Sequence, residues 1–150
     1  MIAGCDRRGT SYGLFSVSEA IGVSPWYWWA DAPVVKKKEL RLQVNTIVSK
    51  EPSVKYRGIF INDEDWGLMP WSSLHYEPWH KPGRIGPKTN ARIFELMLRL
   101  RANTYWPAMH ECTQPFFLTQ GNREVAEQYG IYIGGSHCEP MASSTVGEWR

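Results

Sequence analysis

The chain of 150 residues has few cysteines, little excess charge of either sign and no long apolar run. Its three cysteines are an odd number without a CxxC pair, which argues against a disulfide framework and a zinc knuckle. Lys and Arg total 17 against 15 for Asp and Glu, so the net charge of +2 argues against a polyanionic partner. No apolar stretch approaches the roughly 20 residues of a membrane helix. We therefore expect no nucleic-acid partner, no membrane and no cofactor.

Aromatic residues, in contrast, are abundant, with 8 Trp, 7 Tyr and 5 Phe. Rings at this density suit either a packed core or a surface that stacks on flat partners such as sugars. Residues 66–88 hold Trp66, His75 and His80 among several prolines and show no helical or alternating pattern. A long stretch without secondary structure is typical of a lid or binding loop. A packed insertion without a ligand is the alternative.

Three apolar runs share one layout, in which a segment shaped like a buried strand ends in a polar cluster with a carboxylate. The runs are Tyr56–Ile61, Thr104–Met109 and Ile131–Gly135. Helical patterns separate them, one capped by Thr89 or Asn90 and the other over Arg123–Tyr129. Such a strand-helix-strand-helix-strand series predicts a parallel sheet or barrel in which the carboxyl ends of the strands meet at one edge.

The first third of the chain has a different pattern. A helix is predicted over Ser11–Ile21, and residues 24–33 predict an irregular buried loop. Apolar and polar side chains alternate over Glu39–Ser49, which is typical of a strand with one wet face. Pro52 then breaks the pattern, so we place a domain boundary near residue 53.

Carboxylates follow each of the three predicted strands: Asp63, Glu64, Asp65, Glu111 and Glu139. Glycoside cleavage needs one carboxylic acid and one carboxylate, and crowding can raise the pKa of one member of such a group. Capping of a turn is the alternative for Asp63 and Asp65, and the choice of proton donor stays open. We expect substrate contacts from neighbouring polar and aromatic side chains: Asn62, Glu64, Trp66, Trp106, His110 and His137.

A metal centre is another interpretation of the same strand ends. Six side chains could in principle bind a metal: His110, Glu111, Cys112, His137, Cys138 and Glu139. Their spacing follows the β/α repeat and not a ligand motif, so we expect no metal. Two alternative functions remain, a metal-dependent barrel hydrolase and a non-catalytic carbohydrate-binding module that uses exposed Trp.

Five segments in order along the chain are characteristic: Arg8–Gly13, Ile21–Asp31, Tyr56–Glu64, Leu100–Met109 and Ser136–Met141. Together they resemble the xylan α-glucuronidases of glycoside hydrolase family 115. The resemblance implies that residues 1–52 are the C-terminal part of a hexosaminidase-like N-terminal α/β domain. Residues 53–150 would be the N-terminal part of a (β/α)8 catalytic barrel, its first three βα units. Because a barrel takes about 250 residues, we expect a truncated fragment.

The resemblance also implies an activity, the hydrolysis of α-1,2-linked glucuronic acid or its 4-O-methyl ether from glucuronoxylan with inversion. Matched motif by motif, Asp63, Glu111 and Glu139 are implied as catalytic. Inversion would hold acid and base ~6.5–9.5 Å apart. One of three cationic side chains is expected to bind the uronate carboxylate: Arg57, Arg84 or Lys88.

Glucuronoxylan is accordingly the expected partner. For the full-length protein we expect a homodimer that is secreted or periplasmic, and the location of the fragment itself stays open. The 150-residue chain alone is expected to be inactive and prone to aggregation, because a sheet of three strands leaves both edges unpaired.

Overall fold

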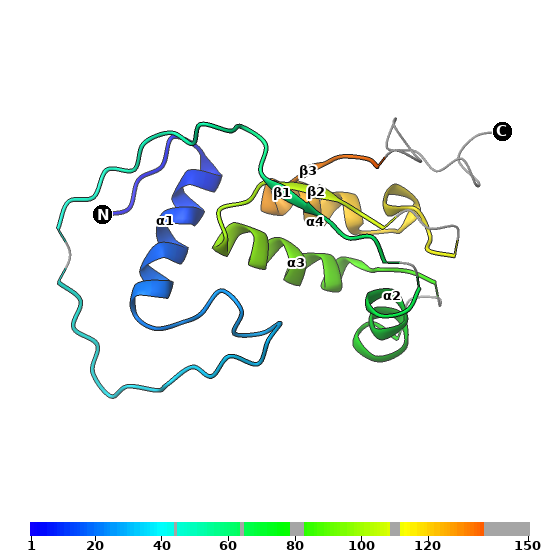
Figure 1. Cartoon of the computed structure of the whole chain (residues 1–150), viewed down its shortest axis with the longest axis horizontal. Helices are drawn as coiled ribbons and strands as arrows, with labels where there is room; N and C mark the ends of the chain where they lie inside the picture. The colour runs from blue at the N-terminus through cyan, green and yellow to red at the C-terminus, as the bar shows by residue number, and fades with distance from the viewer. Residues whose placement is uncertain (44, 64, 79–82, 109–111, 137–150) are drawn as a thin grey trace.

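The computed structural model describes residues 1–43, 45–63, 65–78, 83–108 and 112–136 (Figure 1). Its elements are α1 (Arg7–Ala20), β1 (Gly58–Phe60), α2 (Leu68–Trp71), the π-helix η1 (Ser72–Tyr76), α3 (Pro87–Arg99), β2 (Thr104–Trp106), the 3-10 helix η2 (Phe116–Leu118), α4 (Asn122–Tyr129) and β3 (Tyr132–Ile133). The three strands form one parallel sheet in the order β1-β2-β3. The predicted alternation of strands and helices around a parallel sheet is confirmed.

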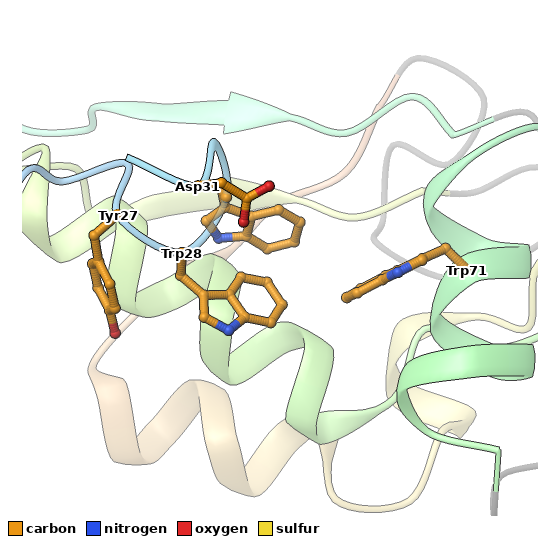
Figure 2. Close-up of a pocket in the computed structure, with 5 residues that line it drawn as sticks. Tyr27, Trp28, Asp31 and Trp71 are labelled. Atoms are coloured by element: carbon orange, nitrogen blue, oxygen red, sulfur yellow. The ribbon is translucent and has the colours of Figure 1, made fainter. Parts of the chain in front are cut away.

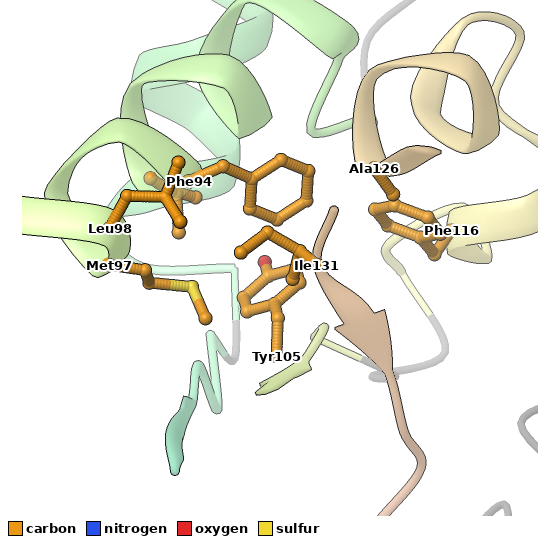
Figure 3. Close-up of a cluster of buried hydrophobic side chains, with 8 residues drawn as sticks. Phe94, Met97, Leu98, Tyr105, Phe116, Ala126 and Ile131 are labelled. Atoms are coloured by element: carbon orange, nitrogen blue, oxygen red, sulfur yellow. The ribbon is translucent and has the colours of Figure 1, made fainter. Parts of the chain in front are cut away.

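One face of the sheet carries the hydrophobic core beneath α3 and α4 (Figure 3). Tyr105 of the central strand is buried, and its ring meets Phe94 of α3 edge-on at 5.5 Å and Phe116 of η2 at 6.2 Å. The remaining members of the core are Ile93, Met97, Leu98, Ala126 and Ile131. Removal of these side chains from water is the main force that holds the helices on the sheet.

The opposite face of the sheet lies bare in the described part of the chain. Phe60, Trp106 and Tyr132 are each 40–42% exposed. Ile59 of the edge strand β1 is 41% exposed as well, so the prediction that the run Tyr56–Ile61 is a buried strand is wrong as to its burial. The apolar run indicated a strand correctly, but the burial of a strand depends on what covers it.

Close pairing of β1 with β2 requires a glycine at the first position of β1. Gly58 is in register with Thr104, and a side-chain carbon on Gly58 would collide with the Thr104 carbonyl oxygen. The strand can approach its neighbour this closely only because residue 58 has no side chain.

Helix α1 packs against α3 and begins four residues before the predicted start at Ser11. The Asp6 carboxylate accepts a hydrogen bond of 2.7 Å from the Gly9 amide and so caps the helix. Helix α1 is also attached to the segment before β2, because the Tyr12 hydroxyl donates to the Ala102 carbonyl at 3.1 Å.

The predicted strand over Glu39–Ser49 does not form. Residues 39–43 and 45–49 have no regular structure and run around the outside of α1 (Figure 1). Leu40 and Val48 are 53% and 85% exposed. An alternating pattern gives a strand only where another strand pairs with it, and no described strand runs beside this segment.

Residues 66–88 are not a structureless loop, contrary to the sequence prediction, because α2 and η1 lie within them. Two of the prolines that suggested a loop occupy first turns instead. Pro70 is the third residue of α2 and Pro87 the first of α3, where a missing amide hydrogen costs little. Gly86 rather than Thr89 or Asn90 is therefore the N-cap of α3. None of the described helices has the length and apolar character to span a membrane.

Candidate active site

The carboxyl ends of all three strands lie at one edge of the sheet, because the strands are parallel neighbours. Residues 61–63 follow β1 there, residues 107–108 follow β2 and residues 134–136 follow β3. The predicted convergence of the strand ends is thus present. Five of the predicted site residues lie outside the described residues, and their roles stay predictions: Glu64, His110, Glu111, His137 and Glu139.

Asp63 caps the short helix α2. One of its carboxylate oxygens accepts from the Leu68 amide at 3.2 Å, and the other accepts from the Met69 amide at 2.6 Å. This is the capping role that the sequence left open, and it fixes the orientation of the carboxylate at the strand edge. Burial raises the pKa of the Tyr105 phenol, and the nearby Asp63 charge raises that pKa further.

Asp65 connects the segment after β1 with the segment after β2. Its carboxylate accepts a hydrogen bond of 2.7 Å from the hydroxyl of the buried Thr113. The backbone of Asp65 has a φ of 65°, the left-handed region that a non-glycine residue rarely adopts. A second bond, from the Gln114 amide to the Gly83 carbonyl at 2.7 Å, joins the same region to the segment before α3. The loops at this edge therefore support one another.

Trp106 ends β2 on the bare face of the sheet. Its ring meets Phe60 edge-on at 6.0 Å, and a side-chain carbon on Gly134 would collide with its indole. Trp106 thus lies between the ends of β1 and β3, close to where substrate is expected. Trp66 is 90% exposed, and Asn62 is exposed as well.

Of the three cations considered for the uronate carboxylate, Arg57 is at the wrong end of the sheet. It precedes β1, and its guanidinium donates to the carbonyls of Val54 at 2.7 Å and Arg101 at 3.0 Å. That prediction is therefore wrong. Arg84 lies next to Gly83, on the same side as the strand ends, and remains a candidate together with Lys88.

A family model described as glycosyl hydrolase family 115 matches residues 49–150. The chain belongs to glycosyl hydrolase family 115. The matched range includes all three strands and every predicted site residue. The family that the sequence motifs resembled is thus confirmed.

A solved structure of a family 115 protein is similar over most of the chain. It is described as a 4-O-methyl-α-glucuronidase with specificity for decorated arabinogalactans. The identity is 66% and the TM-score 0.86, and the match covers 93% of this chain. The chain spans only 18% of that protein's chain. A comparison with curated proteins found no match.

The sequence reasoning missed Glu77, an acid that is buried in the described part of this family 115 chain. Its carboxylate is fully buried and accepts from the Lys88 amide at 2.8 Å and from the Thr89 amide and hydroxyl at 2.7 and 2.6 Å. These groups begin α3, so Glu77 joins the end of η1 to the next helix. Pro87 at the first helical position was a usable signal for the helix start, but nothing in the spacing pointed to Glu77 as its partner.

The metal alternative finds no support in the described ranges. No group of three or more His, Cys, Asp or Glu side chains there could hold a metal ion. Most of the six side chains considered from the sequence lie beyond those ranges, and Cys112, which is described, is exposed.

Proposed function

We propose that the complete protein is an α-glucuronidase that releases glucuronic acid or its 4-O-methyl ether from a plant polysaccharide. The observation that carries the proposal is the 66% identity, over 93% of the chain, to a protein described as a 4-O-methyl-α-glucuronidase. The family match over residues 49–150 supports it independently. The edge of the sheet where the strands end is a suitable location for the catalytic residues, because parallel strands bring residues from separate loops to one edge.

A decorated arabinogalactan is our first candidate substrate, because that is the specificity described for the similar protein. Glucuronoxylan, which the sequence motifs suggested, is the second. Both present a terminal uronic acid on a neutral glycan, so one set of carboxylates could act on either. The difference between them would come from contacts to the neutral sugars.

For the mechanism we propose inversion by acid and base groups among Asp63, Glu111 and Glu139. Both oxygens of Asp63 already accept backbone N–H groups, so this carboxylate suits a base or an acceptor for a sugar hydroxyl. The proton donor is then Glu111 or Glu139. An inverting pair needs about 6.5–9.5 Å between its carboxyl groups, to leave room for water.

The architecture we propose is the first part of a (β/α)8 barrel from residue 53 on, after the end of a preceding domain. Support comes from the bare face of the sheet, where Phe60, Trp106 and Tyr132 are exposed as the lumen side of an unclosed barrel would be. Formation of a homodimer and a secreted or periplasmic location stay predictions.

The test measures uronic acid release by the complete protein from a decorated arabinogalactan and from glucuronoxylan, with the anomer identified by proton NMR. We expect release as the inverted anomer from at least one polysaccharide. Replacement of the proton donor, by Glu111→Gln or by Glu139→Gln, should lower the rate by about 10²–10⁴, the usual contribution of general acid or base catalysis. The control is Glu19→Gln, the same change at an exposed position of α1.

Two results would reject the proposal. One is an absence of uronic acid release from both polysaccharides, and the other is full activity of both Glu111→Gln and Glu139→Gln. Binding of the glycans without turnover, weakened by loss of Trp66 and not of Glu111, would favour the carbohydrate-binding module instead.

A further inference from the structure

A pocket of about 440 Å³ opens between residues 27–31 and helix α2 (Figure 2). Its lining consists of Tyr27, Trp28, Trp29, Asp31 and Trp71. Small-ligand sites span about 300–1,000 Å³ and combine aromatic walls with a few polar groups, and this pocket has both properties. No role in the proposed catalysis uses these residues.

The aromatic walls are held in place by contacts from outside the pocket. Trp71 stacks on Tyr76 with ring centroids 4.9 Å apart and an angle of 11°. The indole N–H of Trp29 donates to the Arg92 carbonyl at 3.2 Å, and the Arg92 guanidinium lies 5.0 Å from the ring of Trp28. Rings fixed before a ligand arrives lose little conformational entropy on binding.

Polar groups of the lining remain available for a ligand. Among the described residues, the indole N–H groups of Trp28 and Trp71 have no hydrogen-bond acceptor, and the Asp31 carboxylate has no donor. Asp31 has a φ of 47°, a left-handed backbone conformation that costs energy for a non-glycine residue. The guanidinium of Arg92, which lies over Trp28, pairs with Glu95 at 3.1 Å.

We propose that this pocket binds one neutral sugar unit of the polysaccharide. The apolar face of a sugar ring would pack on the indoles, while its hydroxyls would donate to Asp31 and accept from the free indole N–H groups. The Asp31 charge disfavours a uronic acid, because like charges brought together are repelled. The proposal rests on the proposed function and names a subsite for its substrate.

The position of the pocket suits a subsite next to the strand edge. Asp63 caps the first residues of α2, and Trp71 is the last residue of that helix. Three residues of helix rise by only about 4.5 Å. A glycan that places its uronic acid at the carboxylates of the edge can therefore extend a neighbouring neutral unit toward Trp71.

The experiment measures the affinity of the complete protein for galactobiose, xylobiose and glucuronic acid by isothermal titration calorimetry. We expect binding of at least one disaccharide, and the two disaccharides distinguish an arabinogalactan from a xylan source. Asp31→Gly, which tolerates the left-handed backbone, should weaken that binding about tenfold, since hydrogen bonds to a charged group are lost. Asp31→Asn keeps an acceptor and should stay within about threefold of wild type.

Trp26→Ala is the matched control, because Trp26 is 46% exposed on the same segment and does not line the pocket. It should bind the disaccharide as wild type does. The proposal is overturned if neither disaccharide binds, if Asp31→Gly leaves disaccharide binding unchanged, or if glucuronic acid binding depends on Asp31. Uronic acid release without disaccharide affinity would reject this subsite alone. Disaccharide binding without uronic acid release would reject the proposed function alone.

Discussion

Glu77 joins the segment that follows β1 to α3, the helix that precedes β2. Its replacement should destabilise the start of α3. The fully buried carboxylate accepts the amides of Lys88 and Thr89, which have no acceptor within α3 itself. Glu77→Ala removes three hydrogen bonds to a charged group and leaves the buried Thr89 amide without its acceptor. We expect the local opening free energy to fall by about 3–5 kcal/mol.

Hydrogen exchange of the complete protein, followed by mass spectrometry on peptides covering residues 86–92, measures this change directly. A loss of 3 kcal/mol corresponds to exchange at least about a hundredfold faster. Glu77→Gln keeps one acceptor oxygen but turns its amide group toward a backbone donor. The exchange rate of residues 86–92 in this variant should therefore lie between the rates in wild type and in Glu77→Ala.

Glu124→Ala is the matched control for Glu77→Ala. Glu124 also lies in the first turn of a helix, α4, but it is exposed, so its removal should cost at most about 1 kcal/mol. If Glu77→Ala changes exchange of residues 86–92 by less than tenfold, or no more than Glu124→Ala does, the buried carboxylate does not hold the helix start and this reasoning fails.

Three further predictions concern α1, the sheet and the strand edge. The Gly9 amide lowers the pKa of the Asp6 carboxyl, so the capping contribution is present above the unfolded pKa and is lost as pH falls through the lower folded value. The protection of amides at the start of α1 against hydrogen exchange, relative to the unfolded chain, should fall in acid, and Asp6→Asn should remove that pH dependence. Gly58→Ala should cost about 3 kcal/mol and lower the melting temperature, because the methyl group meets the Thr104 carbonyl. Gly134→Ala should displace the Trp106 indole and lower kcat/KM for uronic acid release. Unchanged kinetics would contradict the assignment of Trp106 to the substrate site.

The parallel sheet could be predicted from the sequence because each strand is a short apolar run between helical patterns. The helical pattern between the first two strands followed equally well, since α3 lies there and buries Ile93, Phe94, Met97 and Leu98. Leu100, the next apolar residue, is the C-cap of α3 and is 45% exposed. Periodicity marks a face but not the residue at which a helix stops.

The errors in secondary structure and the omission of Glu77 share one cause, the dependence of local structure on distant partners. Glu39–Ser49 alternates like a strand, yet no described strand pairs with it. Helix α2, within residues 66–88, depends on Asp63, whose carboxylate accepts from the Leu68 amide five residues further along the chain. Glu77 accepts from amides 11 and 12 residues further along the chain. Contacts at these separations leave no periodic signal in the sequence.

The candidate site could be located from the sequence, but only part of it could be assigned. Parallel strands place residues that follow them at one edge, which fixed the location of Asp63 and Trp106 in advance. The choice of Arg57 failed because a residue before a strand lies at the opposite end of the sheet from a residue after it.

A crystal structure of the complete protein with bound 4-O-methylglucuronic acid tests the central claim most directly. The account predicts the sugar at the carboxyl ends of β1, β2 and β3, within reach of the carboxyl groups of Asp63, Glu111 and Glu139. A sugar bound elsewhere, or two of these acids at opposite ends of the sheet, would contradict it.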